Sequence, residues 1–262
     1  MQGLSFLKHI IFERISKEKH VCFAELQKLV GKLNFAQTAT MGKVGRVALR
    51  PLYDMIMRGG GQLDKRSSWA LNWRLRLLPD MAPRLIKPIG SLVDVRIYSD
   101  ACTTGGGMAA VALFSGTKEV TVLMTGVADK KLLRSLETTN EIFGLEMFAM
   151  VSAVITLGDQ LRGKRIMLFM DNNAASGALI KGSSRVLIVL AMIESFWGCM
   201  ARLSASCWVE RVASGANPAD APSRGDPLFK EPQVSCDLVS LTKVLQTCQI
   251  SIDRDNLSKK LL

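Results

Sequence analysis

The chain has 262 residues, 48% of them hydrophobic, and a net charge of +11. Its six cysteines include no C-x-x-C pair and have no histidine nearby, which excludes a disulfide framework and a zinc site. The longest apolar runs, such as VLIVLAMI at 186–193, are too short to span a bilayer. We therefore expect no membrane partner and a reducing intracellular compartment: nucleus, cytoplasm or an organelle.

The positive charge is concentrated in the first third of the chain. Residues 1–89 contain 16 Lys and Arg against 6 Asp and Glu, whereas residues 90–262 contain 18 against 17. A cationic segment beside a nearly neutral one is typical of nucleic-acid binding, because neutralising phosphates releases counterions. The alternative is a solvated basic surface without a specific ligand.

The first third is predicted to be helical. In FAELQKLVGKLNFA, residues 23–36, apolar side chains recur at helical spacing. RVALRPLYDMIM, residues 46–57, continues in this style, with Pro51 expected to start a helix and the glycines at 59–61 expected to end it. SSWALNWRLRLLPD, residues 67–80, supplies a serine as helix cap.

After a proline-containing linker at 81–91, the pattern changes to short strands. Apolar runs at 92–99, 107–114 and 119–126 predict an antiparallel meander. A long helix is expected at about 135–157. The elements expected after it are a strand at 165–170, helices at 171–182 (closed by Gly182) and 183–203, a strand at 207–212, a turn or helix start at 217–225, and a tail helix with a polar end at 230–262.

These elements predict an α/β fold with a mixed five-stranded sheet, three antiparallel strands followed by two parallel ones, flanked by helices. The predicted domains are a basic helical domain at 1–80, the linker at 81–91, an α/β domain at 92–228 and a C-terminal tail at 229–262.

Four acidic residues stand out by their positions: Asp100 and Asp171 at the ends of predicted strands, Glu146 inside an apolar helix, and Asp220 in NPADAPSR. If the chain returns beside its first strand, Asp100 and Asp171 meet at one edge of the sheet. Converging carboxylates repel each other, and a divalent cation relieves the repulsion. Oxygen ligands suit Mg²⁺ or Mn²⁺, and two such ions catalyse phosphodiester hydrolysis.

Each acid also has a simpler interpretation. Asp100 and the glycines of YSDACTTGGG would form a hairpin turn. Asp171 would cap the following helix, and Asp220 would be a cap or turn residue before a short one. Glu146 would pair with a lysine or an arginine, since a glutamate on an apolar helix is costly to bury alone.

The segments YSDACTTGGG, TTNEIFGLEMFA, LFMDNNAA and NPADAPSR follow one another as they do in ribonuclease H domains attached to reverse transcriptases, which residues 92–225 resemble. The four acids are separated by 46, 25 and 49 residues, which is compatible with that fold. Residues 25–56 are similar to the thumb and connection region of retroelement polymerases, especially DIRS-type elements. The resemblance extends over about residues 20–226.

The resemblance implies a ribonuclease H-like fold preceded by a thumb-like domain, and two Mg²⁺ or Mn²⁺ ions. Glu141 is a rival for Glu146, which is preferred because the family's glutamate stands three residues before a small residue, here Ala149. The implied metal roles are that Asp100 bridges both ions, Glu146 binds the second ion, Asp171 binds and orients the water, and Asp220 completes the shell of the first ion.

The resemblance also implies substrate-binding residues. Asn172, Asn217 and Arg224 would position phosphates or the turn that carries the last acid. Thr103 and Thr104 lie where the family contacts the RNA strand, whose 2′-OH distinguishes it from DNA.

Two departures from the family pattern affect this interpretation. Many cellular ribonucleases H have a histidine shortly before the last aspartate, but both histidines here, His9 and His20, are N-terminal, so turnover would be slow. No polymerase palm motif with paired aspartates occurs. We expect a fragment, a processed product or a host protein derived from a retroelement, with a polymerase domain or a ribonucleoprotein as possible partner.

Three functions follow. The first is metal-dependent endonucleolytic cleavage of the RNA strand of RNA/DNA hybrids. The alternative is a non-catalytic, domesticated RNA-binding or structural subunit of a ribonucleoprotein. A nuclease of the Holliday-junction or transposase type would share the acids but would not explain the basic thumb-like segment.

Overall fold

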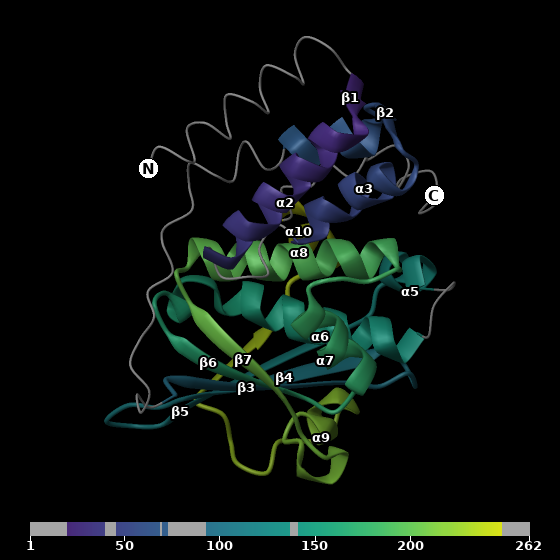
Figure 1. The fold of residues 1–262 in the computed structure, drawn as a ribbon. Coiled ribbons are helices and arrows are strands. Elements are labelled where there is room, and N and C mark those ends of the chain that lie inside the picture. Colours follow the sequence, from purple (N-terminus) through teal and green to yellow (C-terminus); the bar gives the residue numbers. More distant parts are fainter. Residues whose placement is uncertain (1–19, 40–45, 69, 73–92, 137–140, 248–262) are drawn as a thin grey trace. The chain divides into compact units, whose positions relative to one another are not determined.

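The computed structural model describes residues 20–39, 46–68, 70–72, 93–136 and 141–247 (Figure 1). The chain divides into two compact units, Met1–Leu85 and Ile86–Leu262. The predicted linker at 81–91, most of the last predicted helix of the first third, His9 and the polar end at 248–262 lie outside the described residues.

The first unit contains two main helices and a small antiparallel sheet. Helices α2 (Phe23–Ala39) and α3 (Arg46–Met57) confirm the helical prediction. Strands β1 (His20–Cys22) and β2 (Gly60–Gln62), which pair with each other, were not expected because three residues are too few for an alternating pattern. The helices bury one shared set of apolar side chains: Leu26, Val30, Leu33, Leu49, Leu52 and Met55.

Two local predictions in this unit were wrong. Pro51 lies inside α3 rather than at its start. In the helix interior a proline removes one backbone hydrogen bond, and the burial of Leu49 and Leu52 offsets that cost. The cap of the helical segment beginning at residue 65 is Asp64 rather than a serine, since Asp64 Oδ1 accepts a hydrogen bond of 2.7 Å from the Ser67 backbone N–H.

The second unit is built on a six-stranded mixed sheet with the order β7-β6-β3-β4-β5-β8. Its strands are β3 (Val95–Ala101), β4 (Gly107–Phe114), β5 (Val120–Val127), β6 (Arg165–Met170), β7 (Ser206–Arg211) and β8 (Val234–Asp237). Strands β3, β4 and β5 form an antiparallel meander, and β6 and β7 are parallel additions next to β3. The predicted mixed α/β class is therefore confirmed.

The sixth strand is a correction to the predicted count of five. Strand β8 runs parallel to β5 inside the segment predicted to be a C-terminal tail. All four of its side chains are exposed, so it has no alternation of apolar and polar residues to mark it as a strand. The tail helix is found as α10 (Leu241–Thr247).

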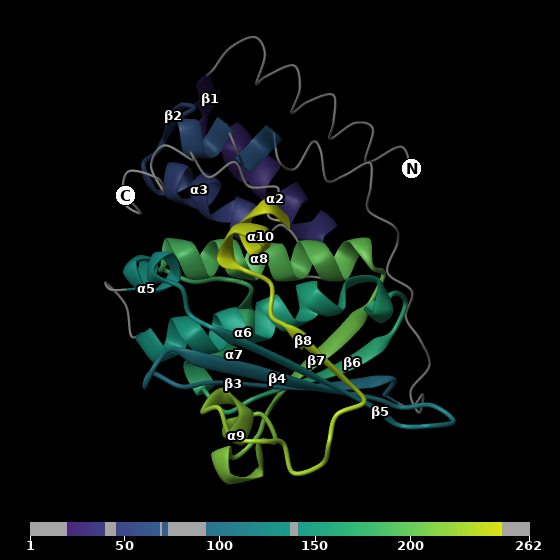
Figure 2. The same ribbon diagram turned by 180° about the vertical axis from the view of Figure 1, so that it is seen from behind.

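Most helices lie on one face of the sheet. Helices α6 (Glu141–Leu157), α7 (Asn173–Lys181) and α8 (Leu187–Arg202) cover this face, whereas the short α9 (Asp220–Ser223) lies on the other (Figures 1 and 2). Helix α6 packs against β3 and β4, and α8 packs against α6. The short α5 (Lys130–Leu136) follows β5. Gly182 ends α7 with φ 64°, as predicted.

One stretch in the described part of the chain is long and apolar enough to cross a membrane, which the sequence pattern had not indicated. Glu141–Leu161, which contains α6, is 21 residues long, and an 18-residue window within it has a mean hydropathy of 1.6. Because 67% of that window is buried inside the protein, its apolar character matches that of a core helix.

Candidate metal centre

Asp100 stands near the end of β3 and is only 3% exposed. Two side chains from the segment around α9 contact its carboxylate. Ser223 Oγ donates a hydrogen bond of 2.5 Å to Oδ2, and Asn217 Nδ2 lies 3.5 Å from Oδ1. The hairpin interpretation is correct in part: β3 and β4 form an antiparallel hairpin whose turn contains two of the glycines, but Asp100 lies in the strand, paired with Ala109, and not in the turn.

Asp171 reaches the same edge of the sheet because β6 runs parallel to β3. Tyr98 and Phe169 are partners in the register, and an aspartate stands two residues after each of them. Asp171 is half-buried, and its Oδ2 accepts a hydrogen bond of 2.7 Å from Ser214 Oγ. The parallel pairing thus brings the two aspartates together from distant parts of the chain.

The cap of α7 is Asn172, so the capping interpretation of Asp171 was wrong. Asn172 Oδ1 accepts hydrogen bonds of 3.0 and 3.1 Å from the backbone N–H groups of Ala174 and Ala175. The Asp171 carboxylate is therefore not used as the helix cap. The side-chain oxygen of Asn172, a residue that was predicted to position a phosphate, is occupied by the two capping hydrogen bonds.

Glu146 comes from α6 and is 3% exposed. One carboxylate oxygen from each of Asp100, Glu146 and Asp171 lies within 4.8 Å of the other two. No ion pair of Glu146 is found among the described residues, and its Oε2 has no hydrogen-bond partner there. Burial, and then the neighbouring charges of Asp171 and Asp100, raise the pKa of Glu146 to about 10.

The pKa of Asp100 is raised for the same reasons as that of Glu146. Burial is the largest cause that raises its pKa, and the charges of Asp171 and Asp220 add to the effect, while the hydrogen bond from Ser223 opposes it. Two buried carboxyls with raised pKa values, Asp100 and Glu146, and one unpartnered oxygen fit a hard divalent cation, which would ionise these acids and complete their contacts. The residues present therefore suit Mg²⁺ or Mn²⁺.

Asp220 does not belong to this group of three. It is the first residue of α9, and its Oδ1 accepts a hydrogen bond of 2.7 Å from the guanidinium of Arg224. Of the two roles predicted for Arg224, holding the Asp220 turn is the one that its contacts display. Asp220 is nevertheless near enough to raise the pKa of Asp100.

The remaining predicted residues surround the site in different ways. Glu141 is exposed in the first turn of α6 and is not part of the group. Thr103 and Thr104 are exposed in the turn between β3 and β4. Asn217 is 5% exposed, and its Nδ2 donates a hydrogen bond of 3.0 Å to the Ser99 carbonyl, so it fixes the α9 segment to β3.

Ser223 was missed by the sequence analysis, although it makes the shortest contact to Asp100. It can reach β3 because α9 packs closely on β4: a Cβ on Gly107 would lie 2.0 Å from the Ser223 carbonyl oxygen. Only glycine fits this approach of two backbones. No pattern in the sequence indicates which carboxylate the serine contacts, since 123 residues separate them.

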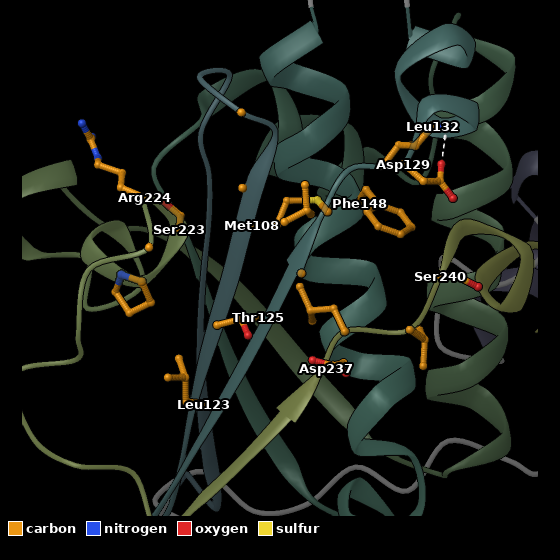
Figure 3. A pocket seen from close by; sticks show the side chains of 18 of the residues that line it. Met108, Leu123, Thr125, Asp129, Leu132, Phe148, Ser223, Arg224, Asp237 and Ser240 are labelled. Atoms are coloured by element: carbon orange, nitrogen blue, oxygen red, sulfur yellow. Dashed lines mark hydrogen bonds between the residues drawn. The ribbon is translucent and has the colours of Figure 1, made fainter.

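A cavity of about 860 Å³ opens beside this site, and Ser223 contributes to both (Figure 3). Arg224 and Ser223 line one end, while Asp237 and Ser240 line the other. Phe148 lies in the wall between them. Asp100, Glu146 and Asp171 do not line the cavity, and Ser223, which contacts Asp100, connects it to the candidate metal centre.

No protein-family model matches the sequence, and no curated protein matches it. The solved structures that are similar to this chain include two of a viral reverse transcriptase. One is the foamy viral protease-reverse transcriptase in complex with dsDNA, with 15% identity and a TM-score of 0.32, covering 77% of this chain and 40% of that chain. The other is the foamy viral protease-reverse transcriptase dRH in complex with dsDNA, with 14% identity and a TM-score of 0.31, covering 76% and 34%. This chain thus spans less than half the length of either, and likenesses of this size support no conclusion about its activity.

Proposed function

We propose that the chain is a metal-dependent endonuclease that cleaves the RNA strand of RNA/DNA hybrids. The observation that carries the proposal is the convergence of Asp100, Glu146 and Asp171, whose carboxylate oxygens lie within 4.8 Å of one another at one edge of the sheet. Among the described residues, none of the three acids forms an ion pair with a lysine or an arginine, and burying Asp100 and Glu146 in this way is costly for a purely structural role.

Asp100, Glu146 and Asp171 would hold the cation. A divalent ion bound there supplies an activated water and neutralises charge that develops on a phosphodiester. Asp171 is the most accessible of the three, so it is the acid best placed to contact a water or a phosphate oxygen. The hydrogen bonds from Ser223 and Ser214 hold the outer two carboxylates in place.

The substrate class rests on the sequence resemblance to ribonuclease H domains and on the distribution of charge. The excess of Lys and Arg in residues 1–89 suits phosphate contacts to a duplex. The exposed Thr103 and Thr104 follow Asp100 by three and four residues, where a strand held at the metal centre would pass. A hybrid bound there would present its RNA 2′-OH groups to these hydroxyls.

A second ion would use Asp220, as the resemblance implies. In the structure Asp220 is paired with Arg224, so binding that ion requires the arginine to move, for example onto a substrate phosphate. The two charged groups lie 2.7 Å apart; Arg224 is exposed and Asp220 is half-buried, and ion pairs at the protein surface are weak.

The Asp220–Arg224 pair also favours a second candidate function, a non-catalytic RNA-binding or structural subunit of a ribonucleoprotein. If Asp220 stays neutralised, the site binds one ion at most and the chain binds nucleic acid without cleaving it. The two candidates differ in a single measurable property, the appearance of cleaved RNA.

The test is incubation of the full chain with an end-labelled RNA/DNA hybrid in Mg²⁺, in Mn²⁺ and in EDTA. We expect cleavage with either metal and none in EDTA. Asp171→Asn is expected to abolish cleavage while hybrid binding is retained, whereas Asp159→Asn, at an exposed acid outside the site, is expected to cleave like the wild type. Absence of product under both metals would favour the subunit, and equal cleavage by Asp171→Asn would refute the assigned site.

A further inference from the structure

Among the described residues of the second unit, one face of the six-stranded sheet next to the candidate metal centre is covered by α9 and its flanking loops alone. The helices α6, α7 and α8 cover the opposite face (Figures 1 and 2). Asp100 contacts Ser223 of α9, so Asp100 points to the face on which α9 lies. Because side chains alternate along a strand, Tyr98 and Arg96 share that face.

The register extends this face across the two outer strands. Tyr98 is paired with Phe169 of β6, and their rings are stacked with centroids 4.6 Å apart and planes 9° apart. Met167 of β6 is paired with Trp208 of β7. We call the set Arg96, Tyr98, Met167, Phe169 and Trp208 the aromatic face.

The aromatic face is accessible on the side of β6 and β7. Trp208 is 66% exposed, and Met167 and Phe169 are half-buried. Helix α9 packs on β3, β4 and β5, with Ala219 against Ala109 and Val111. In the part of the chain that the structure describes, the aromatic side chains of β6 and β7 therefore remain available to a ligand.

The face carries charges of both signs. Glu210 stands opposite Phe169 in the register, and one of its carboxylate oxygens accepts a hydrogen bond of 3.2 Å from Trp208 Nε1. Arg96 is the positive group next to Tyr98. It is half-buried on β3, and no hydrogen bond or ion pair of its guanidinium is found among the described residues. On the same face, by contrast, Arg165 is paired with Asp94 at 2.9 Å. A guanidinium without a carboxylate partner, set beside aromatic rings, is suited to a phosphate group.

We propose that the aromatic face binds an unpaired nucleic-acid strand that continues from the candidate metal centre. Bases would stack on Trp208 and Phe169, and Arg96 would contact the backbone phosphate. The path is continuous, because Asp100 and Asp171 follow Tyr98 and Phe169 by two residues, or about 7 Å, along the same strands. The substrate class rests on the proposed function, whereas strand binding is measurable without cleavage.

The experiment measures fluorescence anisotropy of a short labelled oligouridylate with the full chain in EDTA. Trp208→Ala is expected to raise Kd about tenfold, because stacking of one base is lost, and Trp208→Phe is expected to restore most of the affinity. Arg96→Gln is expected to lower the slope of log K against log salt by about 0.7, the value for one phosphate contact on a single strand. Ile180→Ala, at an exposed apolar residue of α7, is the matched control and is expected to bind like the wild type.

The outcomes separate this proposal from the proposed function. Unchanged affinity in Trp208→Ala and an unchanged salt slope in Arg96→Gln would overturn strand binding, whatever the result of the cleavage assay. Loss of oligonucleotide affinity in a chain that cleaves no hybrid would support strand binding and contradict the nuclease. If sedimentation instead shows that Trp208→Ala dissociates a dimer while oligouridylate binding is unchanged, the face binds a second copy and the proposal fails.

Discussion

Replacing Glu146 by glutamine removes a buried ionisable carboxyl group with little change in the shape of the side chain. The pKa of Glu146 is raised from its ordinary 4.5 to about 10, chiefly by burial. At pH 7 the carboxyl is therefore ionised in the unfolded chain and protonated in the folded one. Each unit of pKa corresponds to about 1.4 kcal/mol, so this protonation costs the metal-free protein about 3 kcal/mol of stability at pH 7.

The sign of the pH dependence follows from the raised pKa. Below pH 4.5 both states are protonated and no stability is lost; from pH 4.5 towards pH 10 the stability contribution declines as the unfolded state releases its proton. Glutamine does not titrate in this window. We expect Glu146→Gln and the wild type to be about equally stable near pH 4.5, and the variant to be about 3 kcal/mol more stable at pH 7.

The assay is urea unfolding in EDTA at both pH values, with Glu141→Gln as control. Glu141 is exposed on the same helix, so its substitution is expected to leave the free energy of unfolding unchanged. Saturating Mn²⁺ is expected to stabilise the wild type and not Glu146→Gln, because a ligand stabilises only the state that binds it. A difference between variant and wild type that does not grow from pH 4.5 to pH 7 would refute the reasoning.

Two further predictions concern the packing of α9 against β3 and β4. Gly107→Ala places a Cβ 2.0 Å from the Ser223 carbonyl oxygen, so α9 must shift by about 1 Å. We expect the rate of hybrid cleavage to fall on the order of 100-fold and the free energy of unfolding to fall by about 1–3 kcal/mol. Gly116→Ala, whose Cβ would make an ordinary contact of 3.5 Å, is expected to leave the cleavage rate and the free energy of unfolding unchanged. Ser223→Ala removes the 2.5 Å hydrogen bond to Asp100 and is expected to weaken Mn²⁺ binding by about 10- to 100-fold in calorimetry, with Ser223→Thr restoring it; equal affinity in all three proteins would show that Asp100 needs no such support.

The sequence predicted those parts of the fold whose side chains alternate or repeat. Strand β3 alternates buried and half-buried residues over most of its length, and β6 alternates over its whole length, which is why both were found. Strand β8 has four exposed side chains and is held by backbone pairing with β5, which leaves no trace in composition. Pro51 was misplaced because a local rule about helix starts was overridden by packing.

Some residues of the candidate site were also predictable from local sequence features, and others were not. Asp100 and Asp171 were found because the position of an acid at a strand end is a local feature, and parallel pairing of the strands follows from the order of elements. The contact of Arg224 with Asp220 was predicted only as one of two possible roles for the arginine, since a separation of four residues suits an ion pair as well as two independent roles. The contact of Ser223 with Asp100 depends on a long-range approach of α9 to β4 that no local pattern encodes.

The central claim is that Asp100, Glu146 and Asp171 together form a divalent cation site. The most direct measurement is an anomalous difference map from crystals of the full chain grown with Mn²⁺. We predict a peak within coordination distance, about 2.0–2.2 Å, of all three carboxylates. A map with no peak between them, at Mn²⁺ concentrations that support hybrid cleavage, would contradict the claim.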